Sequence, residues 1–552
     1  MVASEGGFVQ DPKFVNPTCD FHLQTGSPAI DKGAPLVGYD LEGTERPQRD
    51  GWDIGCYELL PSTEKSVTIA SDVVEGPSGM EIVARAKLEN ITGDIVYRWT
   101  LKNAAGETVK SGGEAIFSYT VSTAGGYSLE LEVEAGGVTY AAKEAQPYMV
   151  KPSEVFVSPD GSDTAPYDTP AKATTNVNAA LAALWQSADA TSVLHIAEGT
   201  YYLTDQLMLS TPVRVLGEGR DVTVLNGSRI PVTTRGLTMT HANAVVRDLT
   251  LAGISNDLYG VGSAVRQEDG LLANVRITKT TINHLGHLGS ISAQAGSLYL
   301  SGGVATNLFI DGATTANSYG STRGLGAYIT GGILTDSIVC SNGLHRGECF
   351  GLGVYMQGGT LRRTKIFDCA AAIASDTRGV GLTLHNEGGG NPVAEDVEVC
   401  GCTHAVYMNK GELRNVLVTG GWTTRDDFAG GLTMEGGTAV NCTLAGSTNS
   451  AKDQQGDLKM TSGTLVNSIA VSATVTGGVQ RNNCLNEPVA FKPDYRLRGS
   501  AANCIDKGDN SVWDGIAEPT DLRGNPRIDR INKTVDLGCF EWSPVGFKLF
   551  VR

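Results

Sequence analysis

Seven apolar residues recur at nearly constant intervals in the C-terminal half of the sequence. The intervals are 29, 27, 28, 24, 26 and 26 residues, and each apolar residue is preceded by Tyr, Thr or Lys and followed by a nearby Gly. These residues are Leu300, Ile329, Met356, Leu384, Met408, Met434 and Met460. A period of this length with short β segments is typical of a solenoid, in which each coil buries its apolar side chains against the next coil. The repeat therefore predicts an all-β, parallel solenoid.

A polar position follows the apolar one by about seven residues in each coil and extends further towards the N-terminus. Its members are Asp248, Asn274, Asn307, Asp336, Arg363, Asp396, Asn415, Asn441 and Asn467. Asn and Asp often occupy turns, where their side chains bond to backbone groups. We expect this polar column to be structural.

Upstream of the repeat, the sequence contains a single helical pattern and a group of alternating strands. Val177, Leu181, Leu184 and Trp185 lie at helical spacing within residues 174–188 and predict an amphipathic cap helix. Residues 63–151 alternate polar and apolar residues between Gly-containing turns, which predicts a small immunoglobulin-like β-sandwich with Trp99 and Tyr127 in its core.

The two ends of the chain carry the same module. GSPAIDKG, DLEGTERP and DIGCYE near the N-terminus correspond to GSAANCIDKG, DLRGNPR and DLGCFE near the C-terminus. Together with the patterns above, this divides the chain into four parts: an end module at residues 1–62, the sandwich at 63–151, the solenoid with its cap at 152–490 and a second end module at 491–552.

Composition excludes two classes of protein. The formal net charge is −17 and no run of Lys or Arg occurs, so nucleic acid is not an expected partner. No stretch is long and apolar enough for a membrane helix, and the opening MVASEGGFVQDP lacks the pattern of a secretory signal peptide. The 69 glycines among 552 residues agree with a turn-rich all-β chain.

These motifs resemble known families. The entry FVSPDGSD with LHIAEGTYYL resembles the start of right-handed parallel β-helix proteins of the pectate-lyase-like superfold. The end modules resemble the closing segment of choice-of-anchor surface proteins, and residues 63–151 are similar to PKD and immunoglobulin-like spacers. The resemblance implies an exported bacterial protein, secreted or at the cell surface. It also implies that residues 1–62 close a preceding β-helix, so that neighbouring domains of a longer parent protein would be partners and the signal peptide would lie outside this piece.

An exported setting would allow cysteines to pair. Each end module contains a candidate pair, and a third pair occupies equivalent positions of successive coils. The disulfide candidates are Cys19 with Cys56, Cys504 with Cys539, and Cys369 with Cys402.

An arginine recurs in the long loop of four coils. Stacked loops would place Arg323, Arg346, Arg378 and Arg425 on one edge, where guanidinium groups suit the carboxylates or sulfates of an acidic polysaccharide. Alternatively, acidic neighbours neutralise these arginines. The candidate substrate-binding residues are Arg323, His345, Arg346, Arg378, His404 and Arg425.

Three functions remain open from the sequence. The favoured hypothesis is a surface or adhesion protein whose rigid β-helix stalk binds polysaccharide along this edge. The first alternative is a polysaccharide lyase or glycoside hydrolase, with Ca²⁺ as an optional cofactor; the second is a purely structural repeat. Candidate catalytic residues are Arg346, Glu348, Asp376, Arg378 and Arg425, with Glu348 and Asp376 as the best hydrolase pair, and candidate Ca²⁺ ligands are Asp376, Asp426 and Asp427.

Overall fold

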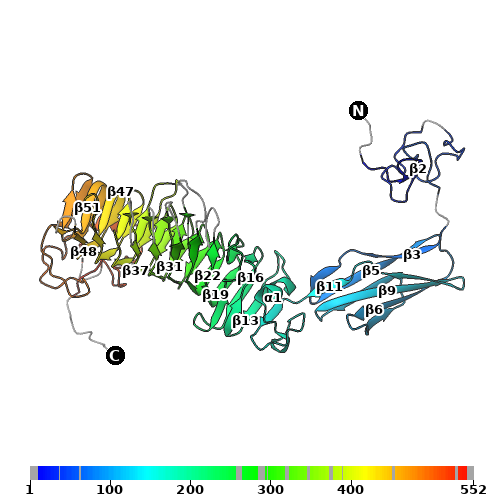
Figure 1. Cartoon of the computed structure of the whole chain (residues 1–552), viewed down its shortest axis with the longest axis horizontal. Helices are drawn as coiled ribbons and strands as arrows, with labels where there is room; N and C mark the ends of the chain where they lie inside the picture. The colour runs from blue at the N-terminus through cyan, green and yellow to red at the C-terminus, as the bar shows by residue number, and fades with distance from the viewer. Residues whose placement is uncertain are drawn as a thin grey trace. The chain divides into compact units, whose positions relative to one another are not determined.

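The computed structural model shows an almost entirely β protein that divides into two compact units, Met1–Val150 and Lys151–Arg552 (Figure 1). The structure describes residues 10–35, 38–60, 64–256, 264–283, 293–294, 296–316, 322–344, 349–371, 377–387, 389–450, 454–528 and 533–543. Among these residues, no helix has the length and apolarity needed to cross a lipid bilayer.

The first unit contains the N-terminal module and a two-sheet sandwich. The module has one hairpin, β1 (Phe14–Asn16) with β2 (Asp20–Leu23), and otherwise consists of turns. The sandwich core includes Trp99 and Tyr127, which are 1% and 5% exposed, as the alternation of its strands predicts. One sheet holds β3 (Ser66–Ser71), β5 (Met80–Glu89) and β8 (Ile116–Val121); the other holds β4 (Glu75–Pro77), β11 (Tyr148–Lys151), β9 (Gly125–Ala135), β6 (Ile95–Asn103), β7 (Thr108–Gly112) and β10 (Val138–Lys143).

A short cap opens the second unit. It contains β12 (Glu154–Val157), the 3₁₀ turn η1 (Pro170–Lys172) and the helix α1 (Val177–Ala183), whose N-cap Asn176 accepts a hydrogen bond from the Ala179 N–H. The helix is shorter than its apolar pattern predicts. Leu184 is buried but has an extended backbone, and the Trp185 N–H donates to the Pro152 carbonyl instead of continuing the helix.

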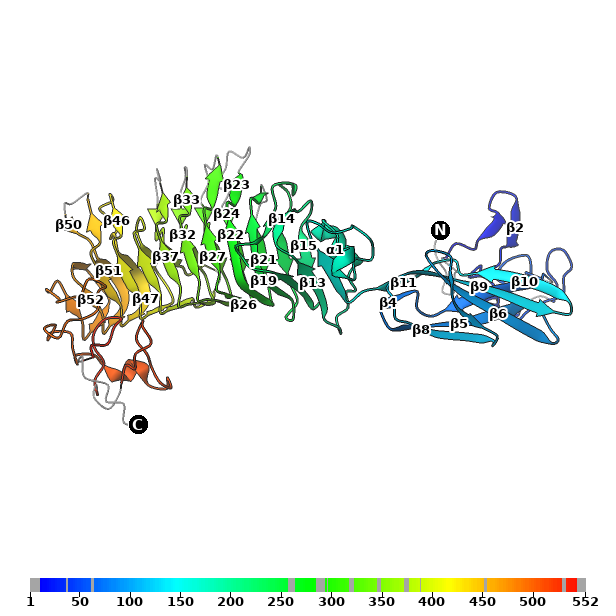
Figure 2. The ribbon, with the colours of Figure 1, turned by 90° about the horizontal axis from the view of Figure 1, so that it is seen from below.

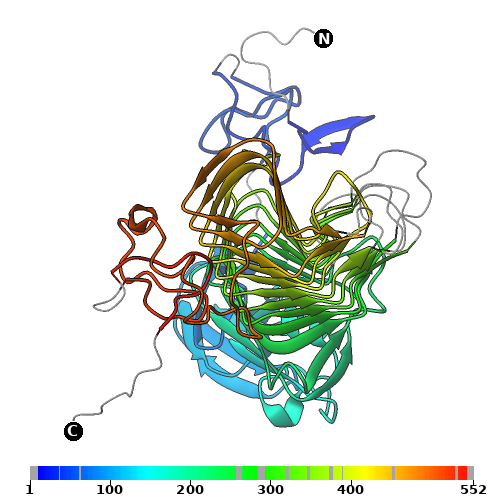
Figure 3. The ribbon, with the colours of Figure 1, turned by 90° about the vertical axis from the view of Figure 1, so that its left-hand side faces the viewer.

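The predicted fold class is confirmed: the second unit is a parallel β-helix solenoid (Figure 3). Its 32-stranded sheet winds through successive coils, each of which adds three short strands in the regular part of the stack. The predicted apolar column is in register from Leu300 to Met460, and all seven side chains are buried. The coil interior is therefore a continuous apolar stack.

The strands of the regular coils fall into three columns. The first column is β25 (Leu298–Leu300), β30 (Ala327–Ile329), β35 (Val354–Met356), β40 (Leu382–Leu384), β43 (Val406–Met408), β47 (Leu432–Val440) and β51 (Leu458–Val466). The second is β26 (Val304–Thr306), β31 (Ile333–Thr335), β36 (Thr360–Arg362), β41 (Val393–Glu395) and β44 (Glu412–Arg414), continued by the C-terminal parts of β47 and β51. The third is β27 (Phe309–Asp311), β32 (Ile338–Cys340), β37 (Lys365–Phe367), β42 (Glu398–Cys400), β45 (Leu417–Thr419), β48 (Thr443–Ala445) and β52 (Ile469–Ala470).

The remaining strands form the first and last coils and an outer layer of loops. The first coils contain β13 (Ser192–Ile196), β14 (Gly199–Tyr202), β15 (Leu207–Leu209), β16 (Val213–Gly217), β17 (Thr223–Asn226), β18 (Leu237–Met239), β19 (Val245–Ala252), β21 (Val265–Gln267) and β22 (Leu271–Thr278), and the last contains β53 (Ala473–Val475), β54 (Val479–Arg481) and β55 (Cys484–Leu485). The loop layer contains β20 (Ser255–Asn256), β23 (Thr281–Asn283), β28 (Thr314–Ala316), β33 (Gly343–Leu344) and β38 (Ala370–Ala371); β24 (Ala293–Gln294), β29 (Thr322–Arg323), β34 (Cys349–Phe350) and β39 (Thr377–Arg378); and β46 (Trp422–Thr423), β49 (Thr448–Asn449) and β50 (Gln454–Gln455).

The polar column occupies the turn between the second and third strands. Every member from Asp248 to Asn467 has a positive φ between 42° and 61°, a left-handed conformation that Asn and Asp tolerate better than most residues. Side chains of successive coils bond to one another, as between Asn274 Nδ2 and Asp248 Oδ1 (2.6 Å). The column therefore has the structural role expected of it.

The C-terminal segment lies against one flank of the last coils (Figure 2). The last members of the polar column hold it: Asn415 Nδ2 donates to the Thr520 carbonyl (2.8 Å), and Asn441 Nδ2 donates to the carbonyls of Asp536 (2.8 Å) and Gly538 (3.1 Å). This segment includes the 3₁₀ turn η2 (Asn510–Trp513). The same column thus stabilises the coils and anchors the end of the chain.

Candidate functional site

The loop layer places two of the predicted arginines in one column. In the sheet β24-β29-β34-β39, Arg323 pairs in register with Phe350, and Phe350 pairs with Arg378. Both guanidinium groups lie over the Phe350 ring, at 5.7 Å and 5.9 Å from its centroid. Of the other predicted site residues, His345, Arg346, Glu348 and Asp376 lie outside the described residues.

Acidic and aromatic neighbours already contact the described arginines. Arg323 forms an ion pair with Glu387, and Arg425 pairs with Asp427 at 2.7 Å. Arg378 lies over the rings of Tyr407 and Phe428, and Arg425 lies 5.0 Å from the Phe428 centroid. Arg323 and Arg425 are thus neutralised and Arg378 is engaged by aromatic rings, which argues against an open positive stripe; for Arg425 the partner is one of the neighbours expected from the sequence.

His404 belongs to the wall of this edge. Its side chain is 3% exposed, its Nε2 lies 2.5 Å from Thr423 Oγ1, and its ring lies 5.0 Å from the Phe428 centroid. Such a buried ring packs within the protein and does not present an acid or base to solvent.

A ladder of aromatic rings faces these arginines. Tyr299, Tyr328, Tyr355 and Tyr407 occupy the central position of β25, β30, β35 and β43, which points away from the coil interior. Their rings and that of His385 stack with centroid separations between 5.1 Å and 6.4 Å. We refer to these five residues as the aromatic ladder.

The loop layer covers most of the ladder. Tyr328, Tyr355 and Tyr407 are at most 2% exposed, and Arg323 and Arg378 lie over the rings of Tyr355 and Tyr407, respectively. Burial raises the pKa of Tyr355 and of Tyr407 to about 12, so both phenols are neutral hydrogen-bond donors at physiological pH. The aromatic ladder therefore packs beneath the loop layer, which covers most of it.

Polar side chains gather at the edge of the ladder. Tyr407 donates to Glu435 Oε2 at 2.6 Å, and the Glu387 N–H lies 3.3 Å from His385 Nδ1. Gln357 Nε2 reaches Glu387 Oε2 at 3.5 Å. Glu387 and Glu435 are exposed while His385 and Gln357 are half-buried, so these four residues, which we call the rim, are open to solvent.

Burial favours the neutral form of the His385 imidazole, and two carboxylates act on this ring. Burial is the largest effect on His385 and lowers its pKa; Arg323 and Arg378 act in the same direction, whereas Glu387 and Glu435 act against it. Both carboxylates are thus close enough to influence the same ring. The rim offers hydrogen-bond acceptors held in place by Arg323, Tyr407 and Gln357.

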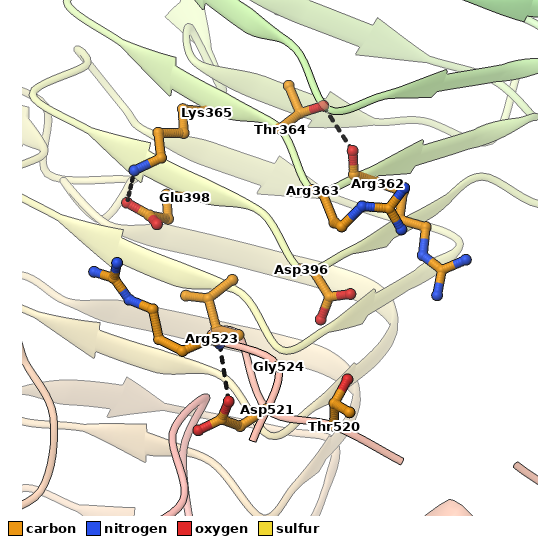
Figure 4. Close-up of a pocket in the computed structure, with 11 residues that line it drawn as sticks. Arg362, Arg363, Thr364, Lys365, Asp396, Glu398, Thr520, Asp521, Arg523 and Gly524 are labelled. Carbon is orange, nitrogen blue, oxygen red and sulfur yellow. Dashed lines mark hydrogen bonds and ion pairs between the residues drawn. The ribbon is translucent and has the colours of Figure 1, made fainter. Parts of the chain in front are cut away.

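A hollow lies where the turn between β36 and β37 meets the C-terminal segment (Figure 4). Its volume is about 450 Å³, and its charged lining is largely paired: Lys365 with Glu398 at 3.2 Å and Arg363 with Asp336 at 2.6 Å. Burial raises the pKa of Asp396 in its wall. The pairing leaves little net charge for a ligand, so we assign this hollow to the junction between the coils and the C-terminal segment.

The candidate metal ligands do not form a cation site in the described part of the chain. Asp427 holds Arg425, Asp426 is exposed beside it, and no group of three or more metal-ligating side chains occurs among the residues described. Asp376 lies outside them.

The described cysteines of the three candidate pairs are all thiols in this structure. Cys504 Sγ lies 2.9 Å from Cys484 Sγ and Cys539 packs against the flank of the coils, so this geometry favours Cys484 over Cys539 as the partner of Cys504. Cys369 and Cys402 are in contact as thiols in successive coils. Cys19 and Cys56 are exposed thiols and form no bond with each other in this structure.

Sequence reasoning missed the aromatic ladder and the two rim carboxylates. The signal for the ladder was present, because Tyr precedes the apolar residue in four of the seven repeats. No spacing pattern marks Glu387 as the partner of Arg323, 64 residues away.

Comparisons with known proteins add a limited context. No protein-family model matches the sequence, and no curated protein matches it. Similar solved structures include ORF18 of Geobacillus virus E2, which is 11% identical with a TM-score of 0.25 over 64% of this chain and 66% of that one. Another is the catalytic unit of a GH87 α-1,3-glucanase from Streptomyces thermodiastaticus, which is 12% identical with a TM-score of 0.24 over 76% of this chain and 87% of that one. A third is a β-glucuronidase from Faecalibacterium prausnitzii, which is 16% identical with a TM-score of 0.12 over 35% of this chain and 37% of that one. These scores are too low to assign a function.

Proposed function

We propose that this chain is a carbohydrate-binding part of an exported bacterial surface protein, in which the β-helix holds the rim in a fixed position. The observation that carries the proposal is the arrangement of Glu387, His385 and Glu435 beside a stacked aromatic ladder. Carboxylates held by Arg323 and Tyr407 can accept hydrogen bonds from sugar hydroxyls without being ordered first. Preorganised polar groups of this kind lower the entropic cost of binding.

The ligand class that fits the rim is a neutral polysaccharide. The two exposed carboxylates of the rim and the net charge of −17 oppose an acidic chain. The arginines expected to attract carboxylates or sulfates instead contact Glu387, Asp427 and aromatic rings. These contacts support neutral glycans over the acidic ones first expected from the sequence.

Calorimetric titration with neutral oligosaccharides tests this proposal. Glu435→Gln keeps the size of the side chain but removes its charge, and we expect the affinity to fall by about tenfold, the effect of losing one charge-assisted hydrogen bond. Glu395→Gln is the matched control, because Glu395 belongs to the second strand column and pairs with Arg362. Equal affinity of the two variants would overturn the assignment of the rim.

The second candidate function is a glycoside hydrolase that uses Glu387 and Glu435. Hydrolases of this type use two carboxyl groups about 5–10 Å apart, and Glu387 and Glu435 both lie at the edge of the ladder, beside His385 and Tyr407. The predicted pair, Glu348 with Asp376, lies outside the described residues. Shortened product chains with wild-type protein, together with unchanged chains for Glu387→Gln and Glu435→Gln variants that still bind, would favour hydrolysis over simple binding.

If neither binding nor turnover is found, the chain is a purely structural repeat.

A polysaccharide lyase needs a cation that holds the carboxylate of its substrate. In the sequence, Arg346 and a Ca²⁺ ion near Asp376 are candidates for that role. New ultraviolet absorbance from unsaturated products of an acidic polysaccharide would replace the present proposal with that alternative.

A further inference from the structure

The two end modules share a turn built around one aspartate. Asp40 Oδ1 accepts the Thr44 N–H (2.7 Å) and Asp40 Oδ2 accepts the Glu58 N–H (3.1 Å). In the C-terminal copy, Asp521 accepts the N–H groups of Asn525 (2.8 Å) and Glu541 (3.0 Å) through the same two oxygens. The repeated sequence therefore folds into the same local structure twice.

A second set of bonds fixes the strip that carries the DIGCYE or DLGCFE sequence. Asp53 accepts the Asp31 N–H (2.8 Å) and the Leu59 N–H (2.7 Å). Asp536 accepts the N–H groups of Asp506 (2.8 Å) and Trp542 (2.5 Å) in the same way. A buried guanidinium supports each strip: Arg46 is paired with Glu58, and Arg527 with Glu541. Both copies thus hold the strip with equivalent hydrogen bonds, with φ of 131° at Gly55 and 86° at Gly538.

In the C-terminal copy, this strip is the contact with the β-helix. The Gly538 N–H donates to the Asn467 carbonyl (2.7 Å), and the Cys539 N–H donates to Thr443 Oγ1 (3.0 Å). Cys539 and Phe540 are at most 2% exposed. A Cβ at position 538 would lie 2.5 Å from Thr443 Oγ1 and 2.8 Å from Ile469 Cδ1, so only glycine permits the approach.

The same strip of the N-terminal copy is open. Gly55 and Cys56, which correspond to Gly538 and Cys539, are exposed, and Leu41, which corresponds to Leu522, is 72% exposed. A Cβ at Gly55 would meet nothing within 4 Å. The φ of 131° at Gly55 itself favours glycine, and the empty space around it shows that this face of the module is uncovered.

We propose that the N-terminal module, residues 10–60, is a docking module whose Gly55–Cys56 strip binds the flank of a parallel β-helix that carries a column of left-handed asparagines. Its partner surface has the chemistry of Asn441, Thr443 and Asn467. The amide and hydroxyl side chains of this surface exchange hydrogen bonds with the backbone of the docked strip, and an apolar residue lies beside them. The C-terminal copy already occupies this surface within the chain. The N-terminal module is complementary to the same surface on another β-helix.

A graft tests the proposal in the full-length chain. Residues 499–543 are replaced by a second copy of residues 26–60, and the exposed Cys19, Cys400 and original Cys56 are changed to Ser, so that the grafted Cys56 can be followed by peptide mass mapping. We expect a thiol reagent to label the grafted Cys56 at least about tenfold more slowly than Cys56 of the wild-type chain, because docking buries it. Slow labelling of the buried Cys442 confirms that the coils are folded. Fast labelling of the grafted Cys56 beside a protected Cys442 would overturn the proposal.

Two glycine variants of the graft compare a position within the strip with one outside it. Gly55 and Gly43 both have positive φ, and in the free module a Cβ at either meets nothing within 4 Å. Gly55→Val should expose the grafted Cys56 and Gly43→Val should leave it protected. Equal labelling in both variants would contradict docking through this strip.

A conservative variant covers the case in which the graft does not fold. Leu537→Ile with Phe540→Tyr converts the docked strip of the natural chain into the sequence of the N-terminal strip. We expect Cys539 to stay as protected as in the wild-type chain. A tenfold or greater increase in its labelling, with Cys442 still protected, would show that the N-terminal strip does not fit this surface.

Discussion

The buried ion pair of the C-terminal segment shows how one residue can join two parts of a fold. The Arg527 side chain is fully buried, donates to Glu541 Oε1 at 2.6 Å and reaches Asn415 Oδ1 of the polar column at 2.5 Å. Burial raises the pKa of Glu541 to about 7, although the guanidinium acts against that shift. The pair therefore depends on all its partners being present.

We expect Arg527→Ala to destabilise the second unit by about 3–5 kcal/mol, because it leaves Glu541 and Asn415 buried without their partner. Arg523→Ala is the control, since Arg523 is exposed and only approaches the Phe540 ring. Urea unfolding measures the free energy of unfolding of both variants. If both variants lost a similar, small amount of stability, the buried pair would not be what holds the C-terminal segment.

His385 gives the rim a pH dependence of known sign. Its pKa is lower in the folded protein, so the unfolded chain binds more protons as the pH falls through the unfolded value of about 6.5, and stability is lost towards acid. The melting temperature of His385→Gln should therefore fall less than that of wild type when the pH is lowered from about 7.5 to 5. His241→Gln is the control, because the His241 Nδ1 accepts a similar backbone hydrogen bond away from the rim. If the melting temperatures of wild type and His385→Gln changed equally with pH, this account would be contradicted.

At the scale of elements, the repeat predicted the coils well but not the contacts between loops. The register of the apolar column and the polar turn that follows it are expected from the sequence alone, because each coil repeats the same local requirements; the left-handed backbone of that turn was found only in the structure. The ion pair of Arg323 with Glu387 depends on loop lengths that vary from coil to coil. Loop packing of this kind carries no period and cannot be read from spacing.

The asparagine column has two roles that can be separated by mutation. Asn441 and Asn307 share a positive φ of about 50°, but only Asn441 bonds to the C-terminal segment, through Asp536, Gly538 and Trp513. We expect Asn441→Ala to cost about 2 kcal/mol more than Asn307→Ala in urea unfolding, since it leaves buried polar groups of the segment unsatisfied. Equal costs would assign both residues to the turn alone.

The last coil and the C-terminal segment can also be joined covalently. The contact between Cys484 and Cys504 lowers the pKa of Cys484, which favours its thiolate as the attacking group. Both sulfurs are buried in the folded chain, so the exchange is run during refolding from urea with oxidised glutathione, where it should form one Cys484–Cys504 disulfide and release two molecules of reduced glutathione. Peptide mass mapping should find this bond and not one between Cys504 and Cys539. A mixed disulfide that persists on Cys484 would contradict the geometry.

At the scale of the whole molecule, the site could be predicted only in outline. The sequence predicted stacked arginines on one loop edge; the structure places Arg323 and Arg378 in one column, where they contact Glu387 and aromatic rings and form no open positive stripe. The tyrosines were visible at a constant position of the repeat, but their stacking required the register of the coils. The proposed ligand class changed from acidic to neutral polysaccharide because contacts within this acidic chain already engage the described arginines.

The most direct test of the proposed function is electrophoresis of the full chain through native gels that contain a neutral or an acidic polysaccharide, at low and at physiological salt. We predict retardation by at least one neutral polysaccharide that is insensitive to salt and is weakened by Glu435→Gln but not by Glu395→Gln. Contacts made by hydrogen bonds survive screening, whereas binding to exposed charges does not. Retardation by acidic polysaccharides alone, lost at physiological salt, would contradict the rim as the binding site.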